Sequence, residues 1–396
     1  MSRVERALNI ADIRRLARRR LPRAIFEVIE GGAGDEITLA ANRADFDAIR
    51  LLPRSLQDVS QVDLTTTVVG QKMSMPVLLA PCSFGRMCNP EAERAVARAA
   101  STFGAGYIMP GGASESVEDV AAASSGPLWY QIYLSPDDAV NDDLLARVEA
   151  SGFQALVVSV DTPMKPYRER DMRNGINLPL AITPRLMMAG VSRPRWSKDF
   201  VFGNMASGFS LTAARKAYYN FESAMSMLRA VTLDDVARLR ERWRGPLIVK
   251  GLLSDDKIRE LVDLGVDAVS VSNHGGRNLD GVSSAVAALP RVVDAAAGGL
   301  EVLVDGGIRR GVDVLRALAL GATACLIGRP YMYGLAAGGQ AGVERVLELM
   351  RNELHVAMAF TGSTAVDTID RGILADRPTA DITTLTAQLE DERISA

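Results

Sequence analysis

Residues 300–311, "LEVLVDGGIRRG", join an apolar run to two glycines and two arginines. Leu300–Asp305 has the near-continuous Val/Leu content of a parallel strand that is covered on both faces. Gly306-Gly307 would let the backbone approach an anion closely, and "TACLIGR", residues 323–329, repeats a Gly-Arg turn one strand later. Tight turns alone would also explain the glycines, but two such turns on adjacent strands favour a bound phosphate.

Working outward from this stretch, eight short apolar runs alternate with helical patterns between residue 75 and about residue 330. Eight strand–helix units in 396 residues predict an α/β protein with a closed (β/α)8 TIM barrel rather than an open sheet. The expected strands are Met75–Pro81, Gly104–Met109, Pro127–Tyr133, Gln154–Asp161, Pro246–Lys250, Val266–Ser272, Leu300–Asp305 and Thr323–Gly328. Helical patterns include Glu91–Thr102, Ser116–Ala123 and Arg310–Leu320.

One connection is longer than a barrel requires. About 80 residues, roughly 162–245, separate the fourth and fifth strands, and we expect this insertion to be a lid or subunit contact at the barrel mouth. A membrane-surface patch is the alternative for this segment. Residues 1–50 are expected to form helices that flank the barrel, within a single domain spanning residues 1–375. Residues 376–396 are expected to form a polar tail.

Composition excludes several classes of protein. Lys and Arg number 45 against 48 Asp and Glu, so nothing suggests nucleic-acid binding. Three cysteines match no zinc motif and only two histidines are present, so we expect reduced thiols and no metal site. No run of about 18 apolar residues or signal-type segment occurs, which favours a cytoplasmic location. The arginine-rich residues 12–23 favour a solvated amphipathic helix with Asp12 as its cap over an organelle address or a membrane-facing helix.

Barrel active sites lie at the carboxyl ends of the strands, and polar residues stand at several of these ends. Lys250 follows "LIV" and should point its ammonium into the mouth, toward a polarised ligand atom, while Asp161 ends the fourth strand. Either residue could instead belong to a structural ion pair. "SNHGGR" after the sixth strand places His274 and Arg277 on the same face: a neutral imidazole can accept a proton, and an arginine suits a carboxylate. His355, in a helical pattern, is interpreted as structural.

These motifs taken in order resemble the FMN-dependent 2-hydroxy-acid oxidase/dehydrogenase family, which includes glycolate oxidase, lactate oxidase, flavocytochrome b2 and mandelate dehydrogenase. The resemblance covers about residues 8–365, and the segments around "YRERD" and "KGLLS" look most like the mandelate dehydrogenase branch. It is carried by "LPRAIFEVIEGGAGDE", "YQIY", "VDTP", "YRERDMRN", "VKG", "SNHGGR", "DGGIRRG" and "LALGATACLIGRP".

The resemblance implies a site built around flavin mononucleotide. It makes His274 the base, Asp161 its partner, and Arg277, Arg168 and Tyr133 the substrate-binding residues. The implied flavin-binding residues are Ser83, Gln131, Ser159, Lys250, Ser272, Asp305, Gly307, Arg309, Gly328 and Arg329. It also implies a homo-oligomer, a homotetramer by analogy with the family, and an electron acceptor that is oxygen, a quinone or a redox partner protein.

Three departures from the family pattern bear on the substrate. Val28 stands where a tyrosine usually binds the substrate carboxylate, Pro110-Gly111-Gly112 replaces a Ser/Thr-rich stretch, and Ser83 replaces a smaller residue near the flavin. We therefore expect oxidation of a 2-hydroxy acid with a bulky or aromatic, mandelate-like side chain. Oxidation of a modified peptide end and a non-redox phosphate-binding barrel are the alternatives.

Overall fold

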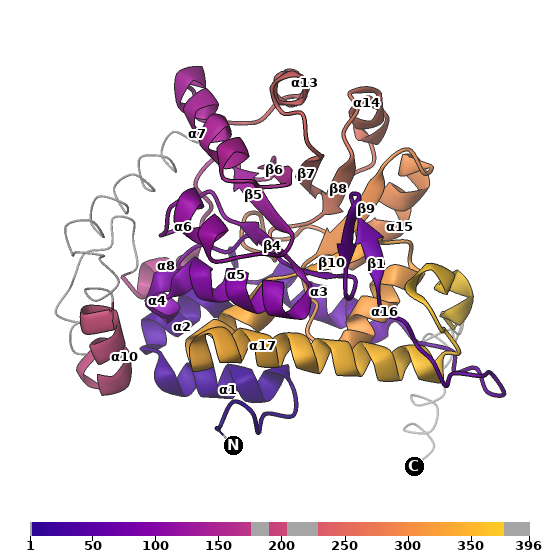
Figure 1. Cartoon of the computed structure of the whole chain (residues 1–396), viewed down its shortest axis with the longest axis horizontal. Helices are drawn as coiled ribbons and strands as arrows, with labels where there is room; N and C mark the ends of the chain where they lie inside the picture. The colour runs from indigo at the N-terminus through magenta and orange to yellow at the C-terminus, as the bar shows by residue number, and fades with distance from the viewer. Residues whose placement is uncertain (1, 176–189, 204–228, 376–396) are drawn as a thin grey trace, which may run out of the picture.

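A closed barrel of eight parallel strands forms the centre of the molecule (Figure 1). The computed structural model describes residues 2–175, 190–203 and 229–375. Each strand overlaps the run expected from the sequence, so the predicted TIM barrel is confirmed. In barrel order the strands are β10 (Ala324–Ile327), β3 (Val77–Leu79), β4 (Gly106–Met109), β5 (Leu128–Ile132), β6 (Ala155–Ser159), β7 (Leu247–Leu252), β8 (Ala268–Val271) and β9 (Glu301–Asp305).

A hairpin that the sequence did not predict packs at the amino-terminal end of the barrel. Its strands β1 (Thr66–Val68) and β2 (Gln71–Met73) pair antiparallel, and Val68 is fully buried. Val68 and Met73 share one apolar cluster with inward side chains such as Trp129, whose Nε1 donates to Gln71 Oε1 at 2.8 Å. The hairpin closes this end, which leaves the carboxyl ends of the strands for a site.

Helices surround the barrel and cover the outer faces of its strands (Figure 1). They include α4 (Gly85–Cys88), α5 (Ala92–Phe103), α6 (Val117–Ala122), α7 (Asp138–Ala150), α13 (Leu233–Arg242), α14 (Ile258–Asp263), α15 (Ala285–Ala296), α16 (Gly311–Ala319) and α17 (Arg329–Phe360). Short 3-10 turns follow at Val366–Thr368 and Arg371–Ile373. The strands are consequently apolar on both faces, as their near-continuous hydrophobic sequences indicated.

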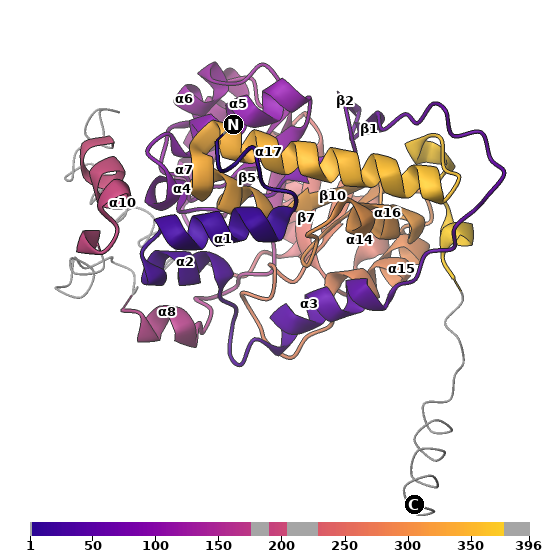
Figure 2. The ribbon, with the colours of Figure 1, turned by 90° about the horizontal axis from the view of Figure 1, so that it is seen from below.

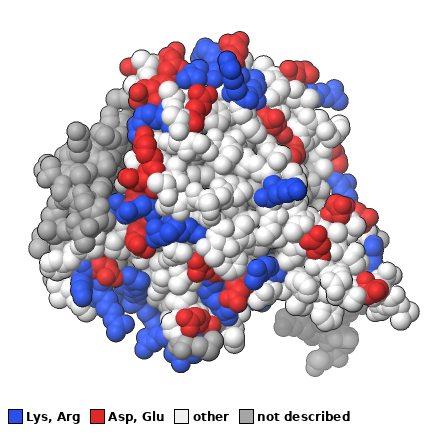
Figure 3. All heavy atoms as spheres, viewed as in Figure 1, with Lys and Arg blue, Asp and Glu red and all other residues white. Residues whose placement is uncertain are grey.

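Three N-terminal helices flank the barrel: α1 (Ile10–Arg20), α2 (Arg23–Glu30) and α3 (Ile37–Ala48). Helix α1 lies alongside α17 (Figure 2). The expected Asp12 cap is wrong, because Asn9 caps α1 and its side chain accepts from the Asp12 N–H. Arg15, Arg18 and Arg19 of α1 are exposed, and Lys and Arg side chains gather over this part of the molecule in Figure 3.

The long β6–β7 connection contains α8 (Glu169–Arg173), α10 (Pro194–Lys198), the π-helical turn Asp199–Gly203 and α13. Helix α13 directly precedes β7, so it serves as the ordinary barrel helix of this unit. Arg20 pairs with Asp199 at 2.5 Å, which fastens part of the connection to α1. Residues 176–189, 204–228 and the expected tail at 376–396 lie outside the described residues. Among the described helices, none has the length and apolarity needed to span a membrane.

Candidate active site

His274 and Asp161 meet at the carboxyl ends of barrel strands. His274 Nδ1 lies 3.1 Å from both carboxylate oxygens of Asp161, which follows β6. Burial alone would raise the pKa of Asp161, but His274, Lys250 and the Thr162 hydroxyl lower it below its usual value. An ionised Asp161 fixes the ring and leaves Nε2 as the nitrogen able to accept a proton. This geometry suits a base whose ring is oriented by a carboxylate.

Lys250 lies beside this pair but its ammonium is already matched by a carboxylate. Its Nζ is 2.7 Å from Asp305 Oδ2 and donates to Ser272 Oγ at 2.9 Å, and Ser272 Oγ donates to Asp305 Oδ1 at 2.8 Å. Burial would lower the pKa of Lys250, but Asp305 and Asp161 outweigh it and raise the pKa. The sequence left open a structural ion pair for Lys250, and the structure shows one. Because this pair lies at the barrel mouth, it also holds a cation in place for an electron-rich ligand atom.

Gln131 and Ser159, at the ends of β5 and β6, are also buried at this mouth. Gln131 Oε1 accepts from the Gly111 N–H at 3.1 Å, while its Nε2 has no hydrogen-bond partner within the described parts of the chain. A side chain at position 111 would place its Cβ 2.7 Å from the Gln131 carbonyl oxygen, so the close approach requires glycine. Ser83, half-buried, follows β3 at the same end. A buried amide donor without a partner indicates a ligand atom at this position.

The glycine turn after β9 has a structural reason of its own. Gly307 has φ +92°, and a Cβ there would lie 2.1 Å from the Asn42 carbonyl oxygen of α3. The N–H groups of Arg309 and Arg310 donate to Asp313, the buried carboxylate that caps α16. The glycines alone therefore do not demonstrate a phosphate site.

The arginine of this turn is the stronger indication of an anion. Arg309 is half-buried, and its guanidinium donates to the Ile308 carbonyl at 2.8 Å, the single acceptor found for it in the described residues. Desolvation lowers the pKa of Arg309 to about 10. A desolvated cation with so few acceptors is costly unless an anion approaches it.

Arg329, at the start of α17 beside Gly328, extends toward α2. Its Nε donates to the Ile29 carbonyl at 2.9 Å and its Nη2 to the Gly31 carbonyl at 2.8 Å. Arg277 reaches the same helix end from the β8 loop, where its Nη1 donates to the carbonyls of Val28 and Gly31 at 2.7 and 2.8 Å. Both arginines therefore meet at the carboxyl end of α2, where orphan carbonyls and the helix dipole favour cations.

Arg168 and Tyr133 complete the set expected to hold a substrate. Arg168 Nε donates to the Arg277 carbonyl at 2.9 Å, so the two guanidiniums come from adjacent loops. Burial and Arg168 lower the pKa of Arg277 to about 9. Burial and Asp161 raise the pKa of Tyr133 to about 12, which keeps the phenol protonated as a hydrogen-bond donor. Val28 is buried and contributes its carbonyl rather than its side chain.

Sequence reasoning assigned no role to Asp171 of "YRERDMRN". Asp171 is only 9% exposed on α8, and its Oδ2 lies 3.8 Å from Arg277 Nη2. The sequence did offer one indication of such a role. Asp171 follows Arg168 by three residues in a helical segment, and this spacing places the two side chains on the same face.

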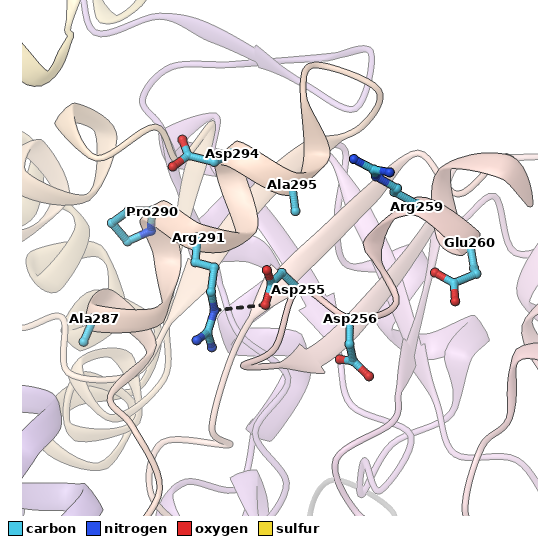
Figure 4. Close-up of a pocket in the computed structure, with 9 residues that line it drawn as sticks. All are labelled: Asp255, Asp256, Arg259, Glu260, Ala287, Pro290, Arg291, Asp294 and Ala295. Carbon is cyan, nitrogen blue, oxygen red and sulfur yellow. Dashed lines mark ion pairs between the residues drawn. The ribbon is translucent and has the colours of Figure 1, made fainter.

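The pocket drawn in Figure 4 lies apart from this site. Its lining comes from the loop after β7, from α14 and from α15, and Arg291 pairs with Asp255 at 3.1 Å across it. None of the predicted site residues lines it, and its charged groups are largely solvent-exposed.

Comparisons with known proteins identify the family of this chain. Residues 17–376 match the FMN-dependent dehydrogenase family. The chain belongs to that family. An L-lactate dehydrogenase of Caulobacter vibrioides is 42% identical over 376 residues, 93% of this chain and 98% of the relative. An L-lactate oxidase of Nostoc sp. is 40% identical, over 94% and 100% of the two chains.

Solved structures agree with this assignment. The FMN-dependent dehydrogenase described here is similar to the monotopic membrane protein (S)-mandelate dehydrogenase, with TM-score 0.88 and 34% identity over 93% of this chain and 99% of that one. A mandelate oxidase with (S)-2-phenylpropionate gives TM-score 0.79 and 37% identity over 93% and 98%. The enzyme uses FMN and oxidises a 2-hydroxy acid, as its sequence motifs predicted.

The residues at the barrel mouth fit FMN on their own chemistry. Gln131 Nε2 and the Lys250 ammonium suit the polar edge of an isoalloxazine, and Arg309 suits a phosphate at the far end. We assign Ser83, Ser159 and Ser272 to the ring end as well. Asp305, Gly307, Gly328 and Arg329 are assigned to the ribityl and phosphate end, and these individual roles stay predictions.

Proposed function

We propose that His274 is the base that accepts the hydroxyl proton of the substrate, with Asp161 holding its ring and stabilising the imidazolium. The observation that supports this role is the 3.1 Å contact of Nδ1 with both Asp161 oxygens, which leaves Nε2 for the substrate. Bound FMN supplies the two-electron acceptor that oxidation of a hydroxy acid to an oxo acid requires. Arg277 and Arg168 bind the substrate carboxylate, and Tyr133 donates to a substrate oxygen.

Alanine at position 274 tests this proposal. His274→Ala should retain the yellow cofactor but reduce flavin roughly 10²–10⁴-fold more slowly when a hydroxy acid is added without oxygen, because the proton then lacks an acceptor. Stopped-flow absorbance of the flavin measures this rate. Bleaching at the wild-type rate in the variant would refute the role.

We infer that L-lactate is the first substrate to test, since the curated lactate enzymes are 40–42% identical to this chain and the mandelate structures 34–37%. This differs from the mandelate-like substrate favoured by the sequence. A bulkier acid is the second candidate because Gly111-Gly112 and Val28 provide no large side chain over the site. An anaerobic panel from lactate to mandelate, scored by flavin bleaching, ranks the two.

A non-redox phosphate-binding barrel does not agree with membership of an FMN-dependent family. Oxidation of a modified peptide end gains no support from relatives that act on lactate. Bleaching of the flavin by any hydroxy acid in the panel would argue further against a peptide substrate.

The electron acceptor, the location and the assembly state each have a direct measurement. Admitting air, a quinone or a candidate redox protein after bleaching identifies the acceptor by the return of the oxidised flavin spectrum. Cytoplasmic location and homo-oligomer formation stay predictions, which cell fractionation and light scattering test.

A further inference from the structure

Asp171 is a buried carboxylate that neither the base nor the flavin assignments use. It lies on α8, and α8 packs against α2, whose end receives Arg277 and Arg329. Its Oδ1 has no hydrogen-bond partner among the residues that the structure describes, and its Oδ2 stands 3.8 Å from Arg277 Nη2. A buried carboxylate oxygen without a hydrogen-bond partner destabilises the folded state unless the charge stabilises a neighbouring cation.

The charges around Asp171 do not cancel. Arg168 and Arg277 contribute two largely desolvated cations, and Asp171 is a carboxylate whose charge acts on both of them. Burial raises the pKa of Asp171, while Arg277 and Arg168 act to lower it.

Three neighbouring ionic groups of the mouth already have partners, and the cations of Arg309 and Arg329 are assigned to the flavin phosphate. Lys250 pairs with Asp305, His274 contacts Asp161, and Arg170 on the same helix pairs with Glu36. The part of the site assigned to the substrate carboxylate therefore carries a single excess positive charge.

We propose that Asp171 is a positioning and specificity-determining residue that matches the arginine pair to a substrate with one negative charge. By balancing one of two guanidiniums, it lets a monocarboxylate neutralise the site and leaves a dicarboxylate with an uncompensated buried anion. The inference rests on the proposed function, since it takes Arg168 and Arg277 as the carboxylate ligands. It extends that function to the number of carboxylates in the substrate.

Anion binding to the FMN-loaded enzyme tests this without turnover. Pyruvate serves as the monoanion and oxalate as a dianion of similar size, each titrated near neutral pH while the flavin spectrum is followed. Asp171→Asn keeps the shape and removes the charge, so the ratio of oxalate to pyruvate affinity should rise at least tenfold. Glu169→Gln removes a charge from the same helix, where Glu169 pairs with Arg173, and should leave the ratio unchanged.

A ratio in Asp171→Asn that equals or falls below the wild-type ratio overturns the proposal. If that variant does not fold, the wild-type enzyme provides a second test with mesoxalate, which has one carboxylate more than pyruvate. Pyruvate should bind more tightly than mesoxalate. Equal or tighter binding of mesoxalate overturns the proposal. Normal anion binding in an enzyme that oxidises no hydroxy acid would instead remove the proposed function. The two failures are thus distinguishable.

Discussion

His274 holds an unusual backbone conformation. Its φ is +56°, Gly275 and Gly276 that follow also have positive φ, and the His274 N–H donates to Ser272 Oγ at 3.0 Å. Histidine tolerates this left-handed region better than most residues, but the conformation persists only where the surroundings impose it. The turn directs the imidazole back over the barrel mouth toward Asp161. Removing that partner should therefore affect chemistry more than binding.

We expect Asp161→Asn to slow anaerobic flavin reduction about 100-fold or more with little change in substrate affinity. Asparagine can still contact Nδ1, but it cannot stabilise the imidazolium that forms when the proton arrives. Because His274 and Lys250 keep the pKa of Asp161 below its usual value, the wild-type carboxylate is ionised and can provide this stabilisation. Equal loss in affinity and rate would argue for a structural role instead.

Glu93 provides a test of stability against pH. It is 1% exposed in α5, and burial, with a further contribution from Glu115, raises its pKa to about 7. The folded protein therefore binds this proton more tightly than the unfolded chain. The contribution to stability is complete below about pH 4.5 and is lost as the pH rises through 7.

Glu93→Gln should remove this dependence. The fall in unfolding free energy between about pH 5 and pH 8, from urea titrations, should be smaller in the variant by roughly 2 kcal/mol. Glu118→Gln is the control, because Arg147 lowers the pKa of Glu118 to about 2 and its titration lies outside this range. Identical slopes for wild type and Glu93→Gln would contradict the expectation.

Among the elements, the β1–β2 hairpin contributes to stability from outside the barrel wall. Val68 is fully buried against the inward side chains, whereas Thr67 beside it is exposed. Val68→Ala should lower the unfolding free energy by about 2 kcal/mol through the cavity it leaves, and Thr67→Ala by less than about 0.5 kcal/mol. Urea denaturation followed by circular dichroism compares them. Equal effects would mean that the hairpin does not seal the barrel.

The elements also show how far the sequence could predict the structure. Each barrel strand was visible because a strand covered on both faces must be apolar throughout, and this is a local property. The β1–β2 hairpin has three-residue strands, too short for a period to appear. The Lys250–Asp305 pair joins β7 to β9, and Arg329 reaches α2 across about 300 residues of sequence. Such partners follow from barrel closure and helix docking, which no single segment encodes.

At the scale of the whole molecule, the desolvated arginines link cofactor binding to stability. Arg309 and Arg329 are half-buried, and desolvation lowers the pKa of each. Removing FMN should lower the melting temperature measurably, because a ligand at about a thousand times its Kd adds about 4 kcal/mol to the folded state. Inorganic phosphate should restore part of the loss if these arginines hold the phosphate. Thermal scans of the apoprotein with and without phosphate make the comparison, and unaltered melting would place the anion elsewhere.

The Gly31 carbonyl oxygen connects the site assigned to the flavin with the site assigned to the substrate. One peptide oxygen accepts from Arg329, assigned to the flavin tail, and from Arg277, assigned to the substrate acid. If either arginine moves, the hydrogen bond of the other to the Gly31 oxygen changes. The binding of the flavin and the binding of the substrate acid are therefore coupled through this backbone atom. The coupling is reciprocal: the enzyme without FMN should bind acids with lower affinity, and a bound acid should slow the dissociation of FMN.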